Sequence, residues 1–241
     1  MDNILIPKNI FFYWNSKNIP ENILNNINSY KNLYNDYNII LLNNKSINKY
    51  IDKYNILIKL FHKITIPTLK SDIIRFIFLY EEGGIWLDVN ISIINNNAIN
   101  IIYDRFKNFD FSILRINHSF YKLRISILIS KKYSNILHDT IQITTNKLLE
   151  HYNKEILNKN YIPYNFFLWT SNVIVKKLNY NNNINKIYDS FNNLVSINTE
   201  KFKKYNCGII TIDNLFKLYS FKRNYKTHWS ILQKKQRLFN I

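Results

Sequence analysis

The stretch LYEEGGIWLDVN, Leu79 to Asn90, contains two of the three glycines in a chain of 241 residues, and the two are adjacent. Upstream of them, Pro67 stands where a helix is expected to begin, and the glycine pair stands where that helix is expected to end. Ile85-Trp86-Leu87 then predicts a short buried strand, which runs into Asp88-Val89-Asn90. The stretch therefore predicts a helix, a sharp turn and a strand whose end carries polar side chains.

The helix predicted before the glycines is apolar on nearly every face from Ile73 to Tyr80, which is typical of a buried helix. It nevertheless contains Asp72 and Arg75, whose i, i+3 spacing puts them on one face. Buried charges are costly unless they are paired with each other or bound to a ligand. Taken alone, the two residues indicate a structural ion pair, whereas the strand end that follows them favours a binding site.

Asp88 and Asn90 alternate along an extended segment and should therefore point to the same side. Open α/β sheets bind their ligands beyond the carboxyl ends of the strands. Two side-chain oxygens placed there can hold a hard divalent cation, with phosphate oxygens and water completing its coordination shell. We therefore expect the helix, the glycine turn and the strand end to form one metal–diphosphate site. The alternative for Asn90 is a cap on the turn after the strand.

The rest of the chain predicts an α/β protein with a Rossmann-like sheet, because strands and helices alternate. Strands are expected over residues 10–14, 37–42, 110–116 and 125–130. A helix is expected from Pro20, one or two helices over residues 45–61, and a further helix over residues 133–149. No internal repeat or Pro/Gly/Ser-rich linker divides the sequence. We therefore expect residues 1–241 to form a single domain.

Composition limits the class of protein. Hydrophobic residues make up 46% of the chain and aromatic residues 16%, both too high for a disordered protein of this length. Cys207 is the sole cysteine, which excludes an intrachain disulfide and a multi-cysteine zinc site. No apolar run is long enough to span a membrane, and the first residues lack the pattern of a signal peptide. We expect a soluble, cytoplasmic protein without a membrane anchor in this chain.

The formal net charge is +17, from 33 Lys and Arg against 16 Asp and Glu. Such an excess attracts polyanions, including nucleic acids and phosphate-bearing substrates. The basic residues are scattered, however, and no nucleic-acid-binding signature accompanies them, which favours a solvated surface. We expect no nucleic acid as a partner.

Two stretches of the sequence resemble family 32 glycosyltransferases and the related glucosylating toxin domains. The central one is SDIIRFIFLYEEGGIWLDVN, and the N-terminal one begins IPKNIFFYWN, so together they cover roughly the first 95 residues. The resemblance implies a GT-A fold, with a mixed sheet flanked by helices. It also implies a hexosyltransferase of glycan biosynthesis that takes a sugar from a nucleotide-diphosphate donor, usually with Mn²⁺ and retention of anomeric configuration.

The resemblance assigns roles to individual residues. Trp14 would stack on the nucleotide base, although its strand alone indicates an ordinary core aromatic. Asp72 and Arg75 would hold the donor sugar, and Asp88 would contact the ribose and the metal. Asn90 stands where the family has the second aspartate of its Asp-x-Asp motif. Asp72, Arg75 and Asp88 are thus the candidate catalytic residues, with Asp88 and Asn90 as metal ligands.

The C-terminal sequence Thr227-His228-Trp229 resembles the family's His-rich ending, which closes over the diphosphate. By this resemblance His228 is a candidate ligand for the diphosphate or the metal, and Trp229 is a candidate for lid packing. A surface histidine is the simpler alternative for His228. The segment Thr170-Ser171-Asn172 loosely matches a polar stretch that the family has near the donor.

These observations together predict a metal-assisted, retaining glycosyltransferase that uses Mn²⁺ or Mg²⁺, a UDP- or GDP-sugar donor and a glycan or glycoprotein acceptor. The alternatives are a pseudoenzyme that binds a nucleotide sugar, suggested by Asn90, and a basic nucleic-acid-binding protein, suggested by the net charge.

Overall fold

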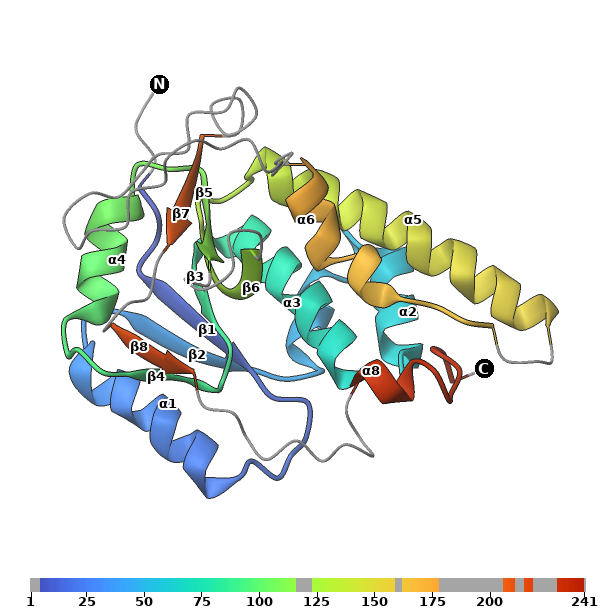
Figure 1. Ribbon diagram of the computed structural model, residues 1–241, viewed down its shortest axis with the longest axis horizontal. Helices are drawn as coiled ribbons and strands as arrows, with labels where there is room; N and C mark the ends of the chain where they lie inside the picture. Colours follow the sequence, from blue (N-terminus) through green and yellow to red (C-terminus); the bar gives the residue numbers. More distant parts are fainter. Residues whose placement is uncertain are drawn as a thin grey trace.

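The computed structural model describes residues 5–115, 123–158, 162–177, 206–210, 215–218 and 229–240 of the chain. Strands and helices alternate along its first half, as the sequence predicts (Figure 1). The strands are β1 (Asn9–Tyr13), β2 (Asn38–Leu42), β3 (Gly84–Leu87), β4 (Ile91–Ile93), β5 (Phe111–Arg115), β6 (Leu123–Ser130), β7 (Cys207–Ile210) and β8 (Phe216–Leu218). The helices are α1 (Glu21–Leu33), α2 (Asn55–Lys63), α3 (Pro67–Glu82), α4 (Ala98–Phe106), α5 (Asn135–Leu157), α6 (Ser171–Lys177) and α8 (Trp229–Leu232), with 3₁₀ turns η1 (Ser46–Tyr50) and η2 (Phe166–Leu168).

Six strands form one mixed sheet in the order β2-β1-β3-β6-β5-β7. Strand β1 runs parallel to its neighbours β2 and β3, whereas β6 runs antiparallel to both β3 and β5. Helices cover both faces of this sheet: α1 and α4 lie on one side, and α2, α3, α5 and α6 on the other (Figure 1). The predicted α/β class with a mixed sheet flanked by helices is therefore confirmed, and it is consistent with a GT-A-like fold.

The alternation of side chains along β1 shows why the sheet has two cores. Phe11 packs into the core beneath α2, α3 and α5, whereas its neighbours Ile10 and Phe12 pack into the core beneath α1 and α4. Successive side chains of a strand point to opposite faces, so an unbroken apolar run is what a strand covered on both sides requires.

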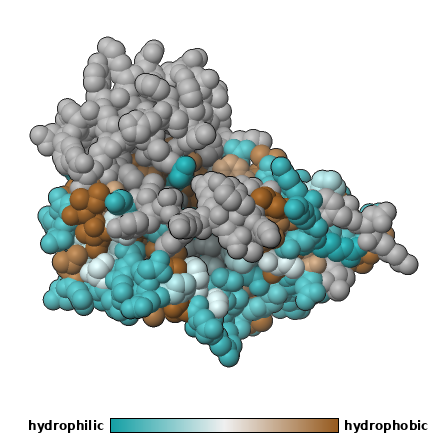
Figure 2. Space-filling view, turned by 60° about the horizontal axis from the view of Figure 1, so that its bottom comes forward, coloured by the Kyte–Doolittle hydropathy of each residue, from teal (hydrophilic) through white to brown (hydrophobic). Residues whose placement is uncertain are grey.

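On the face seen in Figure 2, hydrophilic side chains cover much of the described surface, with separate hydrophobic patches between them.

The glycine pair is required by both conformation and space. Gly83 has a φ of +64° and ends α3, with its N–H donating to the carbonyl of Leu79; Gly84 has a φ of +125° and begins β3. A Cβ on Gly84 would lie 2.5 Å from the carbonyl oxygen of Asn9 on β1, and one on Gly83 would lie 2.8 Å from Pro7 Cδ. The pair therefore allows β3 to leave α3 abruptly and to lie directly against β1.

One helix differs from the prediction. The one or two helices predicted over residues 45–61 are the 3₁₀ turn η1 and α2, which ends at Lys63. The helix predicted over residues 133–149 starts two residues later, because Tyr133 has a φ of +59°, and continues to Leu157. Its last turns bury His151 and Glu155, two polar residues that the sequence does not mark as interior. None of the helices in the described ranges combines the length and the apolar content that a membrane crossing needs.

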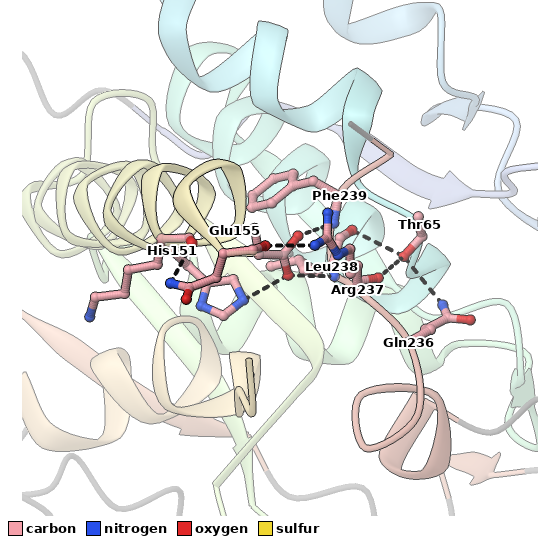
Figure 3. A network of polar contacts seen from close by, with 9 residues as sticks. Thr65, His151, Glu155, Gln236, Arg237, Leu238 and Phe239 are labelled. Atoms are coloured by element: carbon pink, nitrogen blue, oxygen red, sulfur yellow. Dashed lines mark hydrogen bonds and ion pairs between the residues drawn. The ribbon is translucent and has the colours of Figure 1, made fainter. Parts of the chain in front are cut away.

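A buried polar network attaches the C-terminal segment to α5 (Figure 3). One oxygen of Glu155 accepts the N–H of Leu238 at 2.8 Å and lies 3.0 Å from His151 Nε2, while the other accepts the N–H of Phe239 at 3.2 Å. Thr65, just before α3, exchanges further bonds with the same segment: its N–H and its hydroxyl both donate to the carbonyl of Leu238. The network therefore ties residues 236–240 to α5 and to the chain that leads into α3.

The first prediction concerns the glycine turn. Replacing Gly84 with alanine should lower the free energy of unfolding by about 2–5 kcal/mol, because the new Cβ meets the Asn9 carbonyl and the φ angle is unfavourable for alanine. Urea denaturation of the variant measures this loss. Asn25→Ala on the exposed side of α1 is the control, and equal midpoints for the two variants would contradict the steric account.

The second prediction concerns the C-terminal network. Glu155→Ala should leave two backbone N–H groups without their acceptor and loosen residues 236–240, at a cost of about 1–3 kcal/mol. Trypsin should then cleave after Lys234, Lys235 or Arg237 several-fold faster, which mass spectrometry detects as loss of the last residues. Glu150→Ala removes an exposed carboxylate of the same helix and should leave the cleavage rate unchanged. Equal cleavage of both variants would show that Glu155 does not hold the segment.

Candidate active site

A pocket of about 240 Å³ lies where the end of β1, the start of α3 and the turn after β3 meet. Its walls contain Trp14, Arg75, Asp88 and Asn90, which are four of the residues that the sequence predicts for the site. The remaining lining residues come from the same three segments: Tyr13, Asn15, Pro67, Thr68, Ser71, Trp86 and Val89. The structure therefore brings the N-terminal motif and the central motif to one place, as the resemblance implies.

Arg75 is the centre of the site. Its Nη2 donates to Asp88 Oδ1 at 2.7 Å, its Nη1 donates to the carbonyl of Ile125 on β6 at 2.6 Å, and Nη1 lies 3.6 Å from Asp72 Oδ1. The guanidinium also lies over the ring of Trp86, with Cζ 5.0 Å from a ring centroid. Only 3% of the side chain is exposed, and its Nε makes no hydrogen bond within the described residues. One buried cation thus connects α3, β6 and the end of β3.

Asp72 does not line the pocket and reaches it only through Arg75. Its carboxylate accepts a hydrogen bond from the Thr170 hydroxyl at 2.8 Å, which supports the loose match of the segment that begins at Thr170. Burial raises the pKa of Asp72 to about 6, and the positive charge of Arg75 and the Thr170 hydrogen bond offset only part of this effect. The charged form is therefore held at a cost in the folded protein.

Asp88 is more open than Asp72, with 34% of its side chain exposed. Trp86 Nε1 donates to Asp88 Oδ1 at 3.1 Å, so the indole and Arg75 both donate to the same carboxylate oxygen. Asp88 and Asn90 both line the pocket, as their i, i+2 spacing predicts.

The side-chain oxygens of Asp88 and Asn90 could hold a cation only if a bound ligand supplied further oxygens to it. The described ranges contain no group of three or more His, Cys, Asp or Glu side chains that could hold a metal ion by themselves. Asp88 and Asn90 offer one carboxylate and one amide oxygen, and Mg²⁺-type sites often use one or two protein oxygens together with substrate phosphates. The residues present are therefore suited to a cation that a diphosphate helps to hold.

Two predicted site residues are not placed. His228 lies outside the described residues, so its role stays a prediction. Trp229 begins α8, but its side chain is outside the described part. The described segments before and after these two residues do contact the chain beside the site. Leu218 of β8 pairs with Ile91, one residue after Asn90. The carbonyl of Leu238 accepts the N–H of Thr65, two residues before Pro67.

Sequence reasoning missed several residues of the site. Trp86 was read as part of a buried strand, yet its indole bonds Asp88 and its ring lies against Arg75. Ser71, whose hydroxyl lies 3.4 Å from Arg75 Nη2, lines the pocket one helical turn before that arginine. The signal for Trp86 is its i, i+2 spacing from Asp88, since alternate strand residues share a face.

A larger pocket, of about 610 Å³, lies between the start of α2 and the first half of α5. Its lining includes Lys53, Tyr80, His138 and Gln142. None of the predicted site residues belongs to it, and Tyr80 lies near the opposite end of α3 from the turn that lines the smaller pocket. Size alone therefore does not mark the candidate site.

The raised pKa of Asp72 gives a testable pH dependence. The folded protein binds a proton at the Asp72 carboxylate more tightly than the unfolded chain does. The contribution of Asp72 to the free energy of unfolding therefore falls as the pH rises from about 4 to about 6, and it is constant above pH 6. Asp72→Asn has no titrating group at this position. Its free energy of unfolding, relative to that of wild type, should therefore rise by up to about 3 kcal/mol from pH 4 to pH 7. Denaturant unfolding at several pH values measures the difference. A difference that stays constant with pH would contradict the burial of a charged Asp72.

Comparisons with known proteins find similarity over the central part of the chain. Residues 20–107 match the family model described as "Glycosyltransferase sugar-binding region containing DXD motif". Inositol phosphoceramide mannosyltransferase 1 of Schizosaccharomyces pombe (strain 972 / ATCC 24843) is 31% identical over 90 residues, which cover 36% of this chain and 28% of that relative. The match thus spans less than a third of the relative's length.

Among solved structures, the PaToxG Glycosyltransferase superposes with a TM-score of 0.45 and 19% identity, over 71% of this chain and 68% of that one. The family match itself covers α1, α3 and the turn after β3, including every pocket residue that α3 and the turn supply. The expected resemblance is confirmed for this part of the chain: residues 20–107 are similar to the sugar-binding region of glycosyltransferases that contains the DXD motif, and Asp88-Val89-Asn90 lies within the matched residues.

Proposed function

We propose that the chain is a glycosyltransferase that takes a hexose from a UDP- or GDP-sugar, with a divalent cation, and transfers it to a glycan or glycoprotein acceptor. The observation that carries this proposal is the meeting of Trp14, Arg75, Asp88 and Asn90 in one pocket. An aromatic ring, a buried cation and two oxygen ligands are the groups that a nucleoside, a diphosphate and its metal require.

The donor would lie across the pocket from β1 to the turn after β3. Trp14 is half-buried and is fixed at its indole by a bond to the carbonyl of Asn18, so its ring is a suitable surface for a base. Pro67 and Thr68 bring the first turn of α3 to the pocket, and a helix N-terminus favours negative groups such as phosphates. The diphosphate would therefore lie between α3 and Asp88.

A cation held by Asp88 and Asn90 would act as a Lewis acid on the diphosphate leaving group. Arg75 would orient Asp88 through their 2.7 Å bond and would supply fixed positive charge next to the developing negative charge. Asp72 would keep Arg75 in place from the other side. By the family resemblance the reaction would retain the anomeric configuration, and no residue of the described pocket is assigned as a general base.

The sugar and the acceptor follow from the relatives only by analogy. The yeast relative is named a mannosyltransferase, which makes GDP-mannose the first donor to test, followed by UDP-glucose and other UDP-sugars. The name of that relative includes inositol phosphoceramide, which we do not carry over to this chain. The acceptor that we propose is the broader class of glycans and glycoproteins.

A second candidate function is donor binding without transfer, and a specific feature favours it. The only carboxylate of the Asp88-Val89-Asn90 motif is already bonded to Arg75 and Trp86. A pseudoenzyme of this kind would bind a nucleotide sugar but release no free nucleotide during long incubation with Mn²⁺. Release of nucleotide would exclude this alternative.

Asn90 and Asp88 provide the test of the proposed function. If the amide oxygen of Asn90 contacts the cation, Asn90→Asp adds negative charge there, and donor binding should reach half-saturation at about tenfold lower Mn²⁺ concentration. Asp88→Ala should abolish Mn²⁺-dependent binding in either background, because it removes the carboxylate. Calorimetric titration of the donor at a series of Mn²⁺ concentrations measures both effects.

Asn95→Asp is the matched control, since it adds the same charge at an exposed position shortly after β4. An Asn90→Asp curve that superimposes on the wild-type curve would show that Asn90 does not contact the metal. Failure of the wild type to bind any nucleotide sugar at millimolar concentration would refute the donor site as a whole.

A further inference from the structure

The turn that carries Asp88 and Asn90 is held by hydrogen bonds from helix α1. Asn26, in the middle of α1, donates from Nδ2 to the carbonyl of Val89 at 3.0 Å and to the carbonyl of Ile91 at 2.7 Å. These two carbonyls flank Asn90. One side chain therefore fixes the backbone immediately before and immediately after a predicted metal ligand.

Tyr30 adds a third bond to the same turn. Its hydroxyl donates to the carbonyl of Ile91 at 3.0 Å, and its ring is fully buried in the core beneath α1. Tyr30 follows Asn26 by four residues, so the two side chains stand one above the other on one face of the helix. Together they form a rigid bracket of three hydrogen bonds from α1 to the turn.

The chemistry of position 26 is specific. A primary amide nitrogen carries two N–H groups, and both are used here on acceptors that lie two residues apart. Aspartate has the same shape but no donor when ionised, and leucine has a similar volume but no polar atom. Neither replacement can keep the two carbonyls in place, although both fit the space.

The bracket complements the bonds inside the turn. The N–H of Asp88 donates to the carbonyl of Ser126 on β6, and the N–H of Ile91 donates to the carbonyl of Asp88. Val89 and Ile91 pack against the core beneath α1, and Asp88, Val89 and Asn90 line the pocket. Fixing the backbone at Val89 and Ile91 therefore determines the direction of the side chains that alternate with them.

We propose that Asn26, supported by Tyr30, is a positioning residue for the donor site: it sets the backbone of the Asp88–Ile91 turn so that Asp88 and Asn90 can bind a cation and a diphosphate together. The inference rests on the proposed function for the identity of the ligand, but the bracket itself does not. Mispositioning of metal ligands by loss of an outer contact typically weakens binding by about 10- to 100-fold.

The experiment compares Asn26→Leu and Tyr30→Phe with wild type. Asn25→Leu is the matched control, because it makes the same substitution at the exposed neighbouring position of α1. Three quantities are measured: the melting temperature, the exchange rate of the Ile91 amide hydrogen, and the affinity for Mn²⁺ with GDP-mannose or UDP-glucose, well below the melting temperature.

We expect Asn26→Leu to speed exchange at Ile91 at least tenfold and to weaken Mn²⁺-dependent donor binding about tenfold, with a smaller effect of Tyr30→Phe and none of Asn25→Leu. Tyr30→Phe removes one hydroxyl and keeps the buried ring, so it reports on the bracket if Asn26→Leu fails to fold. Combined with Asn90→Ala, Asn26→Leu should cost less affinity than it does in the wild-type background, because part of its effect acts through Asn90 and the rest through Asp88.

A merely structural bond would lower the melting temperature of Asn26→Leu and leave its donor affinity at the wild-type value, which would overturn the inference. Unchanged exchange at Ile91 would overturn it too, whether or not a donor binds. If the wild type binds no donor while Asn26→Leu speeds exchange, the proposed function fails and the bracket stands.

Discussion

The arrangement of this protein depends on one buried guanidinium. Arg75 is almost fully enclosed, and such a charge is stable only when it is paired and hydrogen-bonded. Its partners come from three places: Asp72 on its own helix, the carbonyl of Ile125 on β6, and Asp88 beyond the end of β3. The ion pair with Asp88 and the hydrogen bond to Ile125 join α3 to the sheet, and they fix the position of α3 at the pocket.

The surrounding elements serve this interaction from different sides. Gly83 and Gly84 let the chain reverse from α3 into β3, which returns it past Arg75 and brings Asp88 within bonding distance. The glycines act at one end of β3, and Asn26 acts at the other, where α1 holds the turn. The strained turn, the buried charge and the bracket are thus parts of one construction, which is how strain and buried polar groups commonly occur at functional sites.

The sequence predicts much of this construction because local rules decide it. The apolar run in α3, the i, i+3 spacing of its charges and the adjacent glycines identify a buried helix, an ion pair and a sharp turn without knowledge of the fold. Contacts between distant segments could not be predicted in this way. Asn26 is one of many asparagines in the chain, so no spacing rule connects it to the site. The sequence does not predict the length of α5, because the last turns of this helix bury Glu155, whose carboxylate accepts the N–H groups of Leu238 and Phe239 from the C-terminal segment.

The central claim is that the pocket beside Asp88 binds a nucleotide diphosphate with its cation. The most direct test is a crystal structure of the protein with Mn²⁺ and a UDP- or GDP-sugar that it binds. The account predicts the diphosphate and Mn²⁺ at Asp88 and Asn90, next to the first turn of α3, with the base against Trp14. A nucleotide found instead in the larger pocket between α2 and α5, with the Asp88 pocket empty, would contradict it.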